Sequence, residues 1–165
     1  MSLPDFNPEN ALSGAYAFIG VSDDLSVADP TINWIAYRTG DITFSQEWEN
    51  AEWAFPEQVG TVRQRTHNAK DLEFALSNHV GMSQLKDLGL VDETTDQLQD
   101  KIEKDIRIKV FKSHPADAVA DTANLHIDCY SSELTFTELG LVQDGGTTTM
   151  AAYLNGDIEI YDPSA

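Results

Sequence analysis

Cysteine and basic residues are scarce in this chain of 165 residues. The single cysteine, Cys129, excludes an internal disulfide framework and a metal site built from several cysteines. Lys and Arg together number 10, against 28 Asp and Glu. We therefore do not expect the clustered basic face that binds nucleic acid in a groove.

Long apolar runs and targeting signals are also missing. No run of about 18 apolar residues occurs, so the sequence predicts no membrane-spanning helix. The first residues, MSLPDFNPENALSG, have neither the basic region nor the apolar core of a signal peptide. We therefore expect synthesis in the cytoplasm.

Negative charge is the strongest feature that is present. The formal net charge is −18, and acidic residues are spread from Asp5 to Asp162 instead of forming a tail. Such a chain repels itself, and concentrated salt screens that repulsion because the Debye length falls to roughly 3 Å at 1 M. The composition is typical of a protein from a salt-loving organism or its virus; an ordinary acidic domain is the alternative.

Alternation of apolar and polar residues, together with one short apolar run at residues 14–21, predicts six or seven strands. We expect them within residues 14–21, 33–48, 61–80, 106–111, 125–142 and 144–162. Asp144-Gly145-Gly146 and Asn155-Gly156-Asp157 are the expected turns near the C-terminus. A helix is the alternative for residues 69–78.

Helical spacing appears only in the middle of the chain. We expect one helix over residues 81–90, ended by Gly89, and a second from about Thr94 to Lys104, since apolar residues there recur every four positions. The sequence therefore predicts a mainly β (α+β) fold, an antiparallel β-sandwich or barrel with one or two flanking helices. Residues 1–13 are the expected N-terminal arm, residues 14–162 a single domain and residues 163–165 a C-terminal tip.

Catalytic and metal-binding patterns are not found. His67, His79, His114 and His126 follow no ligand spacing, and we expect His126 and Asp128 to lie on opposite faces of a strand, unable to share a metal ion. Cys129 belongs to an apolar strand face and is expected in the core. We therefore predict no enzyme activity, no cofactor and no metal.

Three aspartates of the second predicted helix, Asp92, Asp96 and Asp100, lie four residues apart. We expect them to form one helical face, either solvated or lining a water-filled channel. The pattern lacks the central glycine and alternating ligands of a calcium loop, so no cation is assigned.

Aromatic residues in an acidic segment are the best candidates for function. Trp48, Trp53 and Phe55 lie within residues 45–60, which show no clear periodicity and are predicted as a protruding loop. Arg63 and Arg65 follow directly. Because aromatic and arginine side chains anchor interfaces, we expect these five residues at a subunit interface. The alternative is a lid folded over the chain's own sheet.

With these elements in place, the chain resembles the tail tube (major tail) proteins of long-tailed viruses. The order is a short strand, a long strand pair with an acidic aromatic arm, a strand with arginines, a helix and a C-terminal hairpin. The segments that carry the resemblance are GDITFSQEWE (40–49), VRQRTHNAKDLEF (62–74), LKDLGLVD (85–92), LTFTELGL (134–141) and YLNGDIEIYD (153–162). The acidity indicates a haloarchaeal virus with a non-contractile (siphovirus) tail.

This resemblance implies a structural virion protein without catalytic activity. Six copies would close a ring by joining their sheets into a β-barrel, and rings would stack into a hollow tube through which viral DNA passes. The loop at 45–60 would reach the neighbouring ring. Expected partners are further copies of the chain, a tape measure protein, a tail terminator and baseplate or distal tail proteins. The expected localisation is the tail of the virion, which is assembled in the host cytoplasm. The alternatives are another tail component, such as a terminator, connector or baseplate hub, and a monomeric halophilic ligand-binding β domain or small enzyme.

Overall fold

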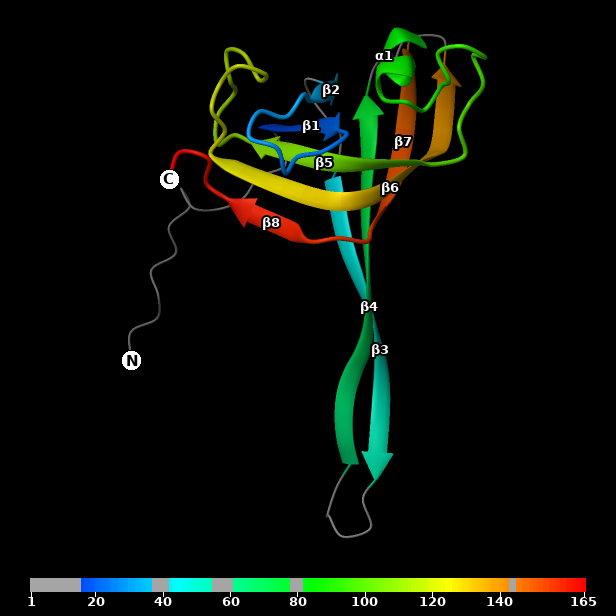
Figure 1. Ribbon diagram of the computed structural model, residues 1–165, viewed down its shortest axis with the longest axis vertical. Coiled ribbons are helices and arrows are strands. Elements are labelled where there is room, and N and C mark those ends of the chain that lie inside the picture. Colours follow the sequence, from blue (N-terminus) through cyan, green and yellow to red (C-terminus); the bar gives the residue numbers. More distant parts are fainter. Residues whose placement is uncertain (1–15, 37–41, 55–60, 78–81, 143–144) are drawn as a thin grey trace.

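The computed structural model describes residues 16–36, 42–54, 61–77, 82–142 and 145–165. Within these ranges the regular structure consists of β-strands and one short helix (Figure 1). The strands and the helix are β1 (Ala17–Ser22), β2 (Asn33–Ala36), β3 (Ile42–Ala54), β4 (Thr61–Ser77), α1 (Met82–Asp87), β5 (Ile102–Val110), β6 (Leu125–Val142), β7 (Gly145–Leu154) and β8 (Ile158–Tyr161). None of the described helical residues forms a helix long and apolar enough to cross a membrane.

All strands belong to one antiparallel sheet in the order β2-β1-β5-β6-β7-β4-β3, with β8 added beside β6. The predicted mainly β fold with a flanking helix is confirmed, in the form of a single open sheet. Figure 1 shows that the sheet bends, so that β1, β5 and β8 run across the direction of β4 and β7.

The long strand β6 links the two parts of the bent sheet. Its first part pairs with β8 from His126 to Cys129, and its second part pairs with β7 from Ser132 to Val142. A bulge separates the two parts, with Ser131 in the left-handed region at a φ of 53°. The buried carboxylate of Asp105 accepts the Ser131 N–H at 2.9 Å and the Leu25 N–H at 2.8 Å, which satisfies both backbone donors.

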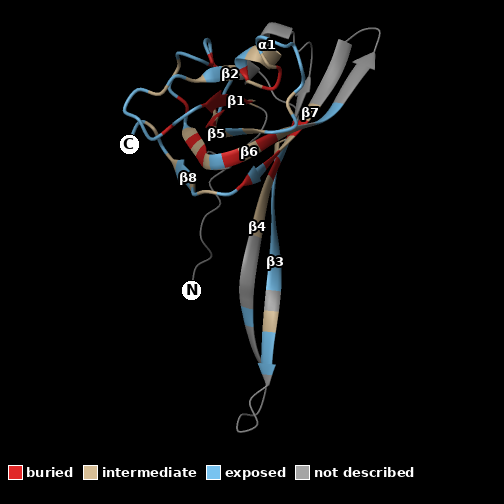
Figure 2. Ribbon diagram, turned by 45° about the vertical axis from the view of Figure 1, so that its right-hand side comes forward, coloured by how far each residue is buried: buried red, intermediate tan, exposed pale blue. Residues whose placement is uncertain are grey.

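The core lies inside the bend and is built by period-two alternation (Figure 2). One face of each of β1, β4, β5, β6 and β7 contributes aliphatic side chains, and Leu88 and Leu90 close the core after α1. Cys129 is fully buried there, as predicted. The helix occupies part of the predicted 81–90 segment, and Gly89, at a φ of 79°, stops it as expected.

The second predicted helix is wrong. Residues 92–95 form a turn in which the Asp92 carboxylate accepts the N–H groups of Thr94 and Thr95, both at 2.8 Å. Val91 and Leu98 make an isolated bridge, and β5 begins at Ile102. A spacing of four residues fits a strand as well as a helix, and here the strand alternation continues to Ile108.

Three further expectations are changed by the structure. Residues 45–54 continue β3 as regular strand, so the irregular loop predicted at 45–60 is wrong for that part, and residues 55–60 lie outside the described residues. The helix alternative for 69–78 is excluded because β4 continues to Ser77. Gly145 and Gly146 begin β7 instead of forming the turn, whereas the turn at Asn155-Gly156-Asp157 is confirmed between β7 and β8.

Candidate interaction surface

The outer part of the β3–β4 hairpin is a two-stranded ribbon. β7 pairs with β4 only from Asp71 to Ser77, whereas β3 and β4 pair along their whole length, from Ile42 opposite Phe74 to Ala54 opposite Thr61. Residues 61–70 therefore extend about 33 Å beyond the sheet at ~3.3 Å per residue. Figure 1 shows this ribbon projecting away from the body. Two-stranded ribbons are at best marginally stable alone in water, so this one is suited to being covered.

Large aromatic side chains are exposed along β3. Phe44 is 41%, Trp48 43% and Trp53 42% exposed, and Figure 2 shows mostly exposed residues on this strand. Phe44 and Trp48 share the strand face of Ile42, which packs against the core, so an apolar stripe runs from the core onto the ribbon. Trp53 is an odd number of residues from Trp48 and lies on the opposite face. Each face of the ribbon therefore carries one exposed tryptophan, and the ribbon projects away from its own sheet instead of covering it as a lid.

The other predicted interface residues are only partly placed. The register puts Arg63 opposite Glu52 and Arg65 opposite Asn50. Opposite charges in register favour strand pairing, so Glu52 has a basic cross-strand neighbour within the same chain. The side chains of both arginines, and Phe55 as a whole, lie outside the described part of the structure. Phe44 was not predicted, although its spacing of four from Trp48 in an alternating segment is the signal that identifies it.

Two strand edges of the described sheet, along β3 and along the second part of β6, can meet each other between two copies of the chain. β3 is the last strand on one side. On the other side, the described pairing of β6 with β5 stops at Leu134, while its pairing with β7 continues to Val142. β6 and β4 run in one direction and β7 and β3 in the other, so β6 of one copy placed beside β3 of the next continues the antiparallel order.

The face of these four strands that points away from the core is polar. It carries hydroxyl and acidic side chains together with Tyr153, which is 59% exposed. Alternation and register place on this face Thr43, Ser45, Asp71, Glu73, Glu133 and Thr135. The threonines are partly turned to the backbone, since Thr135 donates its hydroxyl to the carbonyl of Ala151 at 3.3 Å. This surface is polar and negatively charged.

The three predicted aspartates do not form a helical face. Asp92 accepts backbone N–H groups in its turn, which lowers the pKa of its carboxyl group, with the Thr95 N–H as the largest cause. Asp96 has a φ of 55° and pairs with Lys86 at 2.5 Å, and Asp100 is exposed just before β5. The helical arrangement expected for them is wrong because the second helix is replaced by this turn.

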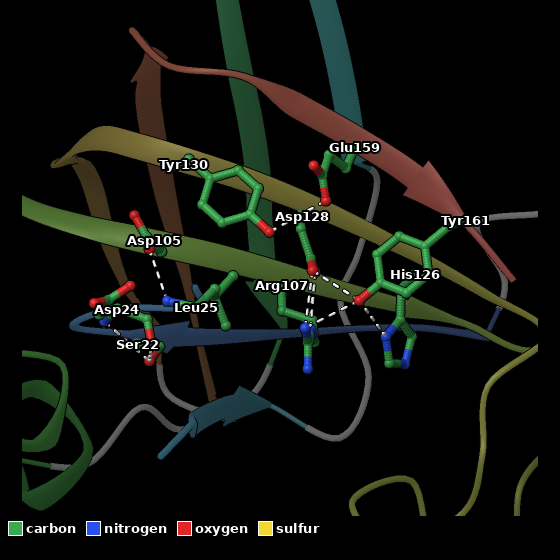
Figure 3. A network of polar contacts seen from close by, with 10 residues as sticks. All are labelled: Ser22, Asp24, Leu25, Asp105, Arg107, His126, Asp128, Tyr130, Glu159 and Tyr161. Carbon is green, nitrogen blue, oxygen red and sulfur yellow. Dashed lines mark hydrogen bonds and ion pairs between the residues drawn. The ribbon is translucent and has the colours of Figure 1, made fainter. Parts of the chain in front are cut away.

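A buried polar cluster lies on the outer face of β5, β6 and β8 (Figure 3). Asp128, 1% exposed, accepts Nε and Nη2 of Arg107, both at 2.8 Å, and the Tyr161 hydroxyl at 2.9 Å. The bidentate bond to Asp128 raises the pKa of Arg107. His126 lies on the same face, so the expectation of opposite faces is wrong: residues two apart in a strand point the same way. That alternation was the signal for this cluster.

Beside this cluster, Lys109 is buried at 8% exposure. Its ammonium group donates to the carbonyls of Ala118, Val119 and Asp121 and lies 5.0 Å from the ring centroid of Trp34. Burial lowers the pKa of Lys109, with the nearby Arg107 as a further cause. In the described residues, no three His, Cys, Asp or Glu side chains gather in a way that could hold a metal ion. Both groups of contacts join β5 and β6 to β8 and to the segment between β5 and β6.

The fold is shared with solved structures of tail-like assemblies. The chain aligns with the anti-feeding prophage cap (AFP tube terminating cap) at a TM-score of 0.55 and 8% identity, over 98% of this chain and 99% of that chain. It aligns with the sheath/tube terminator of an extracellular contractile injection system, PVC, in the extended state. The TM-score is 0.55 and the sequence identity 9%, over 94% of this chain and 99% of that chain. With a chain of the PVC sheath–tube complex in the extended state, the TM-score is 0.56 and the sequence identity 8%, over 94% of both chains. No protein-family model and no curated protein sequence matches the chain.

Proposed function

We propose that the chain is a structural subunit of a tail tube. The observation that carries the proposal is the projecting β3–β4 ribbon with exposed tryptophans on both faces, attached to a sheet whose two edges can pair with each other. The fold likeness supports it, since the compared structures are named as parts of tube terminators and a sheath–tube complex. In this role the protein has no substrate and acts only by assembly.

Ring formation follows from the sheet edges. Pairing β3 of one copy with the outer part of β6 of the next, residues 135–142, is a head-to-tail contact, and such contacts close into rings. The two edges are offset along the strand direction, because β5 covers β6 up to Leu134. A stagger of this kind is what tilted strands need in order to close a barrel. Six copies per ring is the number that the family resemblance implies.

Stacking is assigned to the ribbon. Its length carries it beyond its own sheet to a neighbouring ring, where Trp48, Trp53 and Phe44 would be buried. Each buried aromatic contributes on the order of 1.5–3 kcal/mol. Arg63 and Arg65, and Phe55 near the tip, belong to the same proposed interface.

The polar outer face of β6, β7, β4 and β3 is assigned to the bore. Carboxylate groups repel phosphates and no cluster of basic side chains is proposed there to hold them, so DNA passes without adhering. This assignment differs from the expectation for Asp92, Asp96 and Asp100, which stay candidates for a solvated acidic surface because Asp96 and Asp100 are exposed. With a net charge of −18 per chain, six chains carry −108 (6 × 18), so assembly needs salt or cations. The same acidity supports a haloarchaeal virus as the source, and the resemblance favours a non-contractile tail.

A tube-terminating cap is the second candidate, because two of the three compared structures are terminators. Electron microscopy of the purified protein in 2–3 M KCl, about the range in which surface charge is fully screened, separates the candidates. Long tubes of one diameter support the tube subunit, and rings that never elongate support the cap. Monomers at all concentrations would refute both and favour a monomeric ligand-binding domain.

A further inference from the structure

The C-terminal strand β8 is held to the body by few contacts. It has four residues, Ile158 to Tyr161, and pairs with β6 alone. Ile160 is 62% exposed and Ile158 only partly buried, so apolar burial contributes little. Two side chains of this strand make polar contacts with the body: Glu159 accepts a hydrogen bond from Tyr130 on the exposed rim, and Tyr161 enters the buried polar cluster (Figure 3). We take Tyr161 as the main attachment because the cluster it enters is buried.

The tyrosine hydroxyl is fully used in that cluster. It donates its proton to Asp128 Oδ2 at 2.9 Å and accepts Nη2 of Arg107 at 3.0 Å. His126 Nδ1 lies 3.4 Å from the same oxygen, and the two rings meet edge to face with centroids 5.5 Å apart. Because the hydroxyl has one proton and gives it to Asp128, His126 Nδ1 contacts the oxygen as a donor, which leaves Nε2 as the nitrogen that can gain a proton.

Cations and carboxylates both lie near this imidazole, and the carboxylate of Asp128 opposes the effect of the cations. Arg107 and Lys109 face it from β5, Asp128 and Tyr130 come from β6, and Glu159 and Tyr161 come from β8. Asp117 and Asp121, from the segment between β5 and β6, offset Lys109. His126 itself is only 8% exposed. Burial, followed by the charge of Arg107, lowers its pKa.

We propose that His126 makes β8 a proton-sensitive latch: with a neutral imidazole the strand is docked, and protonation adds a third cation beside Arg107 and Lys109 and releases it. Docking favours the neutral ring, so the docked state has its full stability above the ordinary histidine pKa of about 6.5 and loses stability as the pH falls below it. Release uncovers the edge of β6 from His126 to Cys129 for pairing with another strand. This inference does not depend on the proposed role in a tube.

Hydrogen–deuterium exchange of the full chain in molar KCl at pH 7.5 and pH 5.0 tests the latch. After correction for the intrinsic exchange rate at each pH, peptides covering β8 and residues 126–129 should lose protection several-fold at pH 5.0. Peptides from β1 and β5 should keep theirs. An equal loss in all strands, or no loss in β8, would overturn the proposal.

Cys129 provides a second readout within the native sequence. It lies opposite Ile158, and burial raises the pKa of its thiol to about 12, so it reacts only when the strand opens. Its rate with 4,4′-dithiodipyridine, divided by that of glutathione at the same pH, should rise on acidification in step with β8 exchange. A constant ratio would contradict strand release.

Three variants test whether His126 is the group that causes the acid response. His126→Gln should abolish the acid response while β8 stays docked, and an unchanged acid response would refute the assignment. Tyr161→Phe should raise β8 exchange already at pH 7.5. Tyr153→Phe is the matched control, because Tyr153 is 59% exposed on β7, which does not pair with β8, and it should leave exchange as in the native chain.

Discussion

Removing one indole from the ribbon should block assembly without unfolding the subunit. Trp48 is 43% exposed and Trp53 is 42% exposed. A tryptophan presents up to ~250 Å² of surface, so covering the exposed part of either removes about 100 Å² from water. At ~25 cal/mol/Å² this contributes about 2.5 kcal/mol per contact. The loss corresponds to an association constant lowered about 60-fold.

The assay is the critical concentration for assembly in molar KCl, followed by light scattering and checked by electron microscopy. Trp48→Ala and Trp53→Ala should each raise it by about 60-fold, with the circular dichroism of the subunit unchanged. Tyr153→Ala is the matched control, since Tyr153 is 59% exposed but lies on the sheet face assigned to the bore. Assembly of either tryptophan variant at the native concentration would refute the reasoning, and loss of the fold would show that the indoles are covered by their own chain.

Arg65→Glu adds a carboxylate to an acidic ribbon and should weaken tube formation while the subunit keeps its melting temperature; normal tubes would show that this arginine is only a surface residue. Asp128→Asn removes one partner of a buried ion pair and should lower the free energy of unfolding, measured in urea, by about 3 kcal/mol, because Arg107 remains inside; a change below ~1 kcal/mol would show that water reaches the pair. Gly156→Ala places a Cβ 2.4 Å from the carbonyl oxygen of Tyr130 and should lower the melting temperature measured by circular dichroism; an unchanged value would mean that the turn relaxes. Dilution of KCl from about 1 M to 0.05 M should disperse assembled tubes, as seen by sedimentation, and tubes indifferent to salt would contradict the role given to the net charge.

The β-rich fold was predictable because most strands bury one face. Alternation marked β5 and β6, a short apolar run marked β1, and Gly89 marked the end of α1, since only local residues are needed for these signals. The second helix was mispredicted because a spacing of four residues satisfies both periods. The choice was made by the carboxylate of Asp92, which forms a turn with backbone groups two and three residues later.

The ribbon escaped recognition as a strand pair for a different reason. Neither of its faces is buried by its own chain, so residues 45–54 carry no alternation of apolar and polar residues, and tryptophans occur on both faces. Its partner strand, which sets the register, lies beyond the turn. The polar cluster was missed because its members come from three strands, and Tyr161 and Arg107 meet only through long-range pairing. Its one local signal was the spacing of His126 and Asp128.

The continuity of β4 has a mechanical consequence. The strand runs from the ribbon into the core, where Leu72 and Phe74 are buried, and it pairs with β7 from Asp71 to Ser77. A pull along the ribbon axis therefore loads these backbone hydrogen bonds in shear, and several must break together before the arm can be extracted. Tension applied at the tip of the ribbon is therefore transmitted along β4 directly to the core of the body.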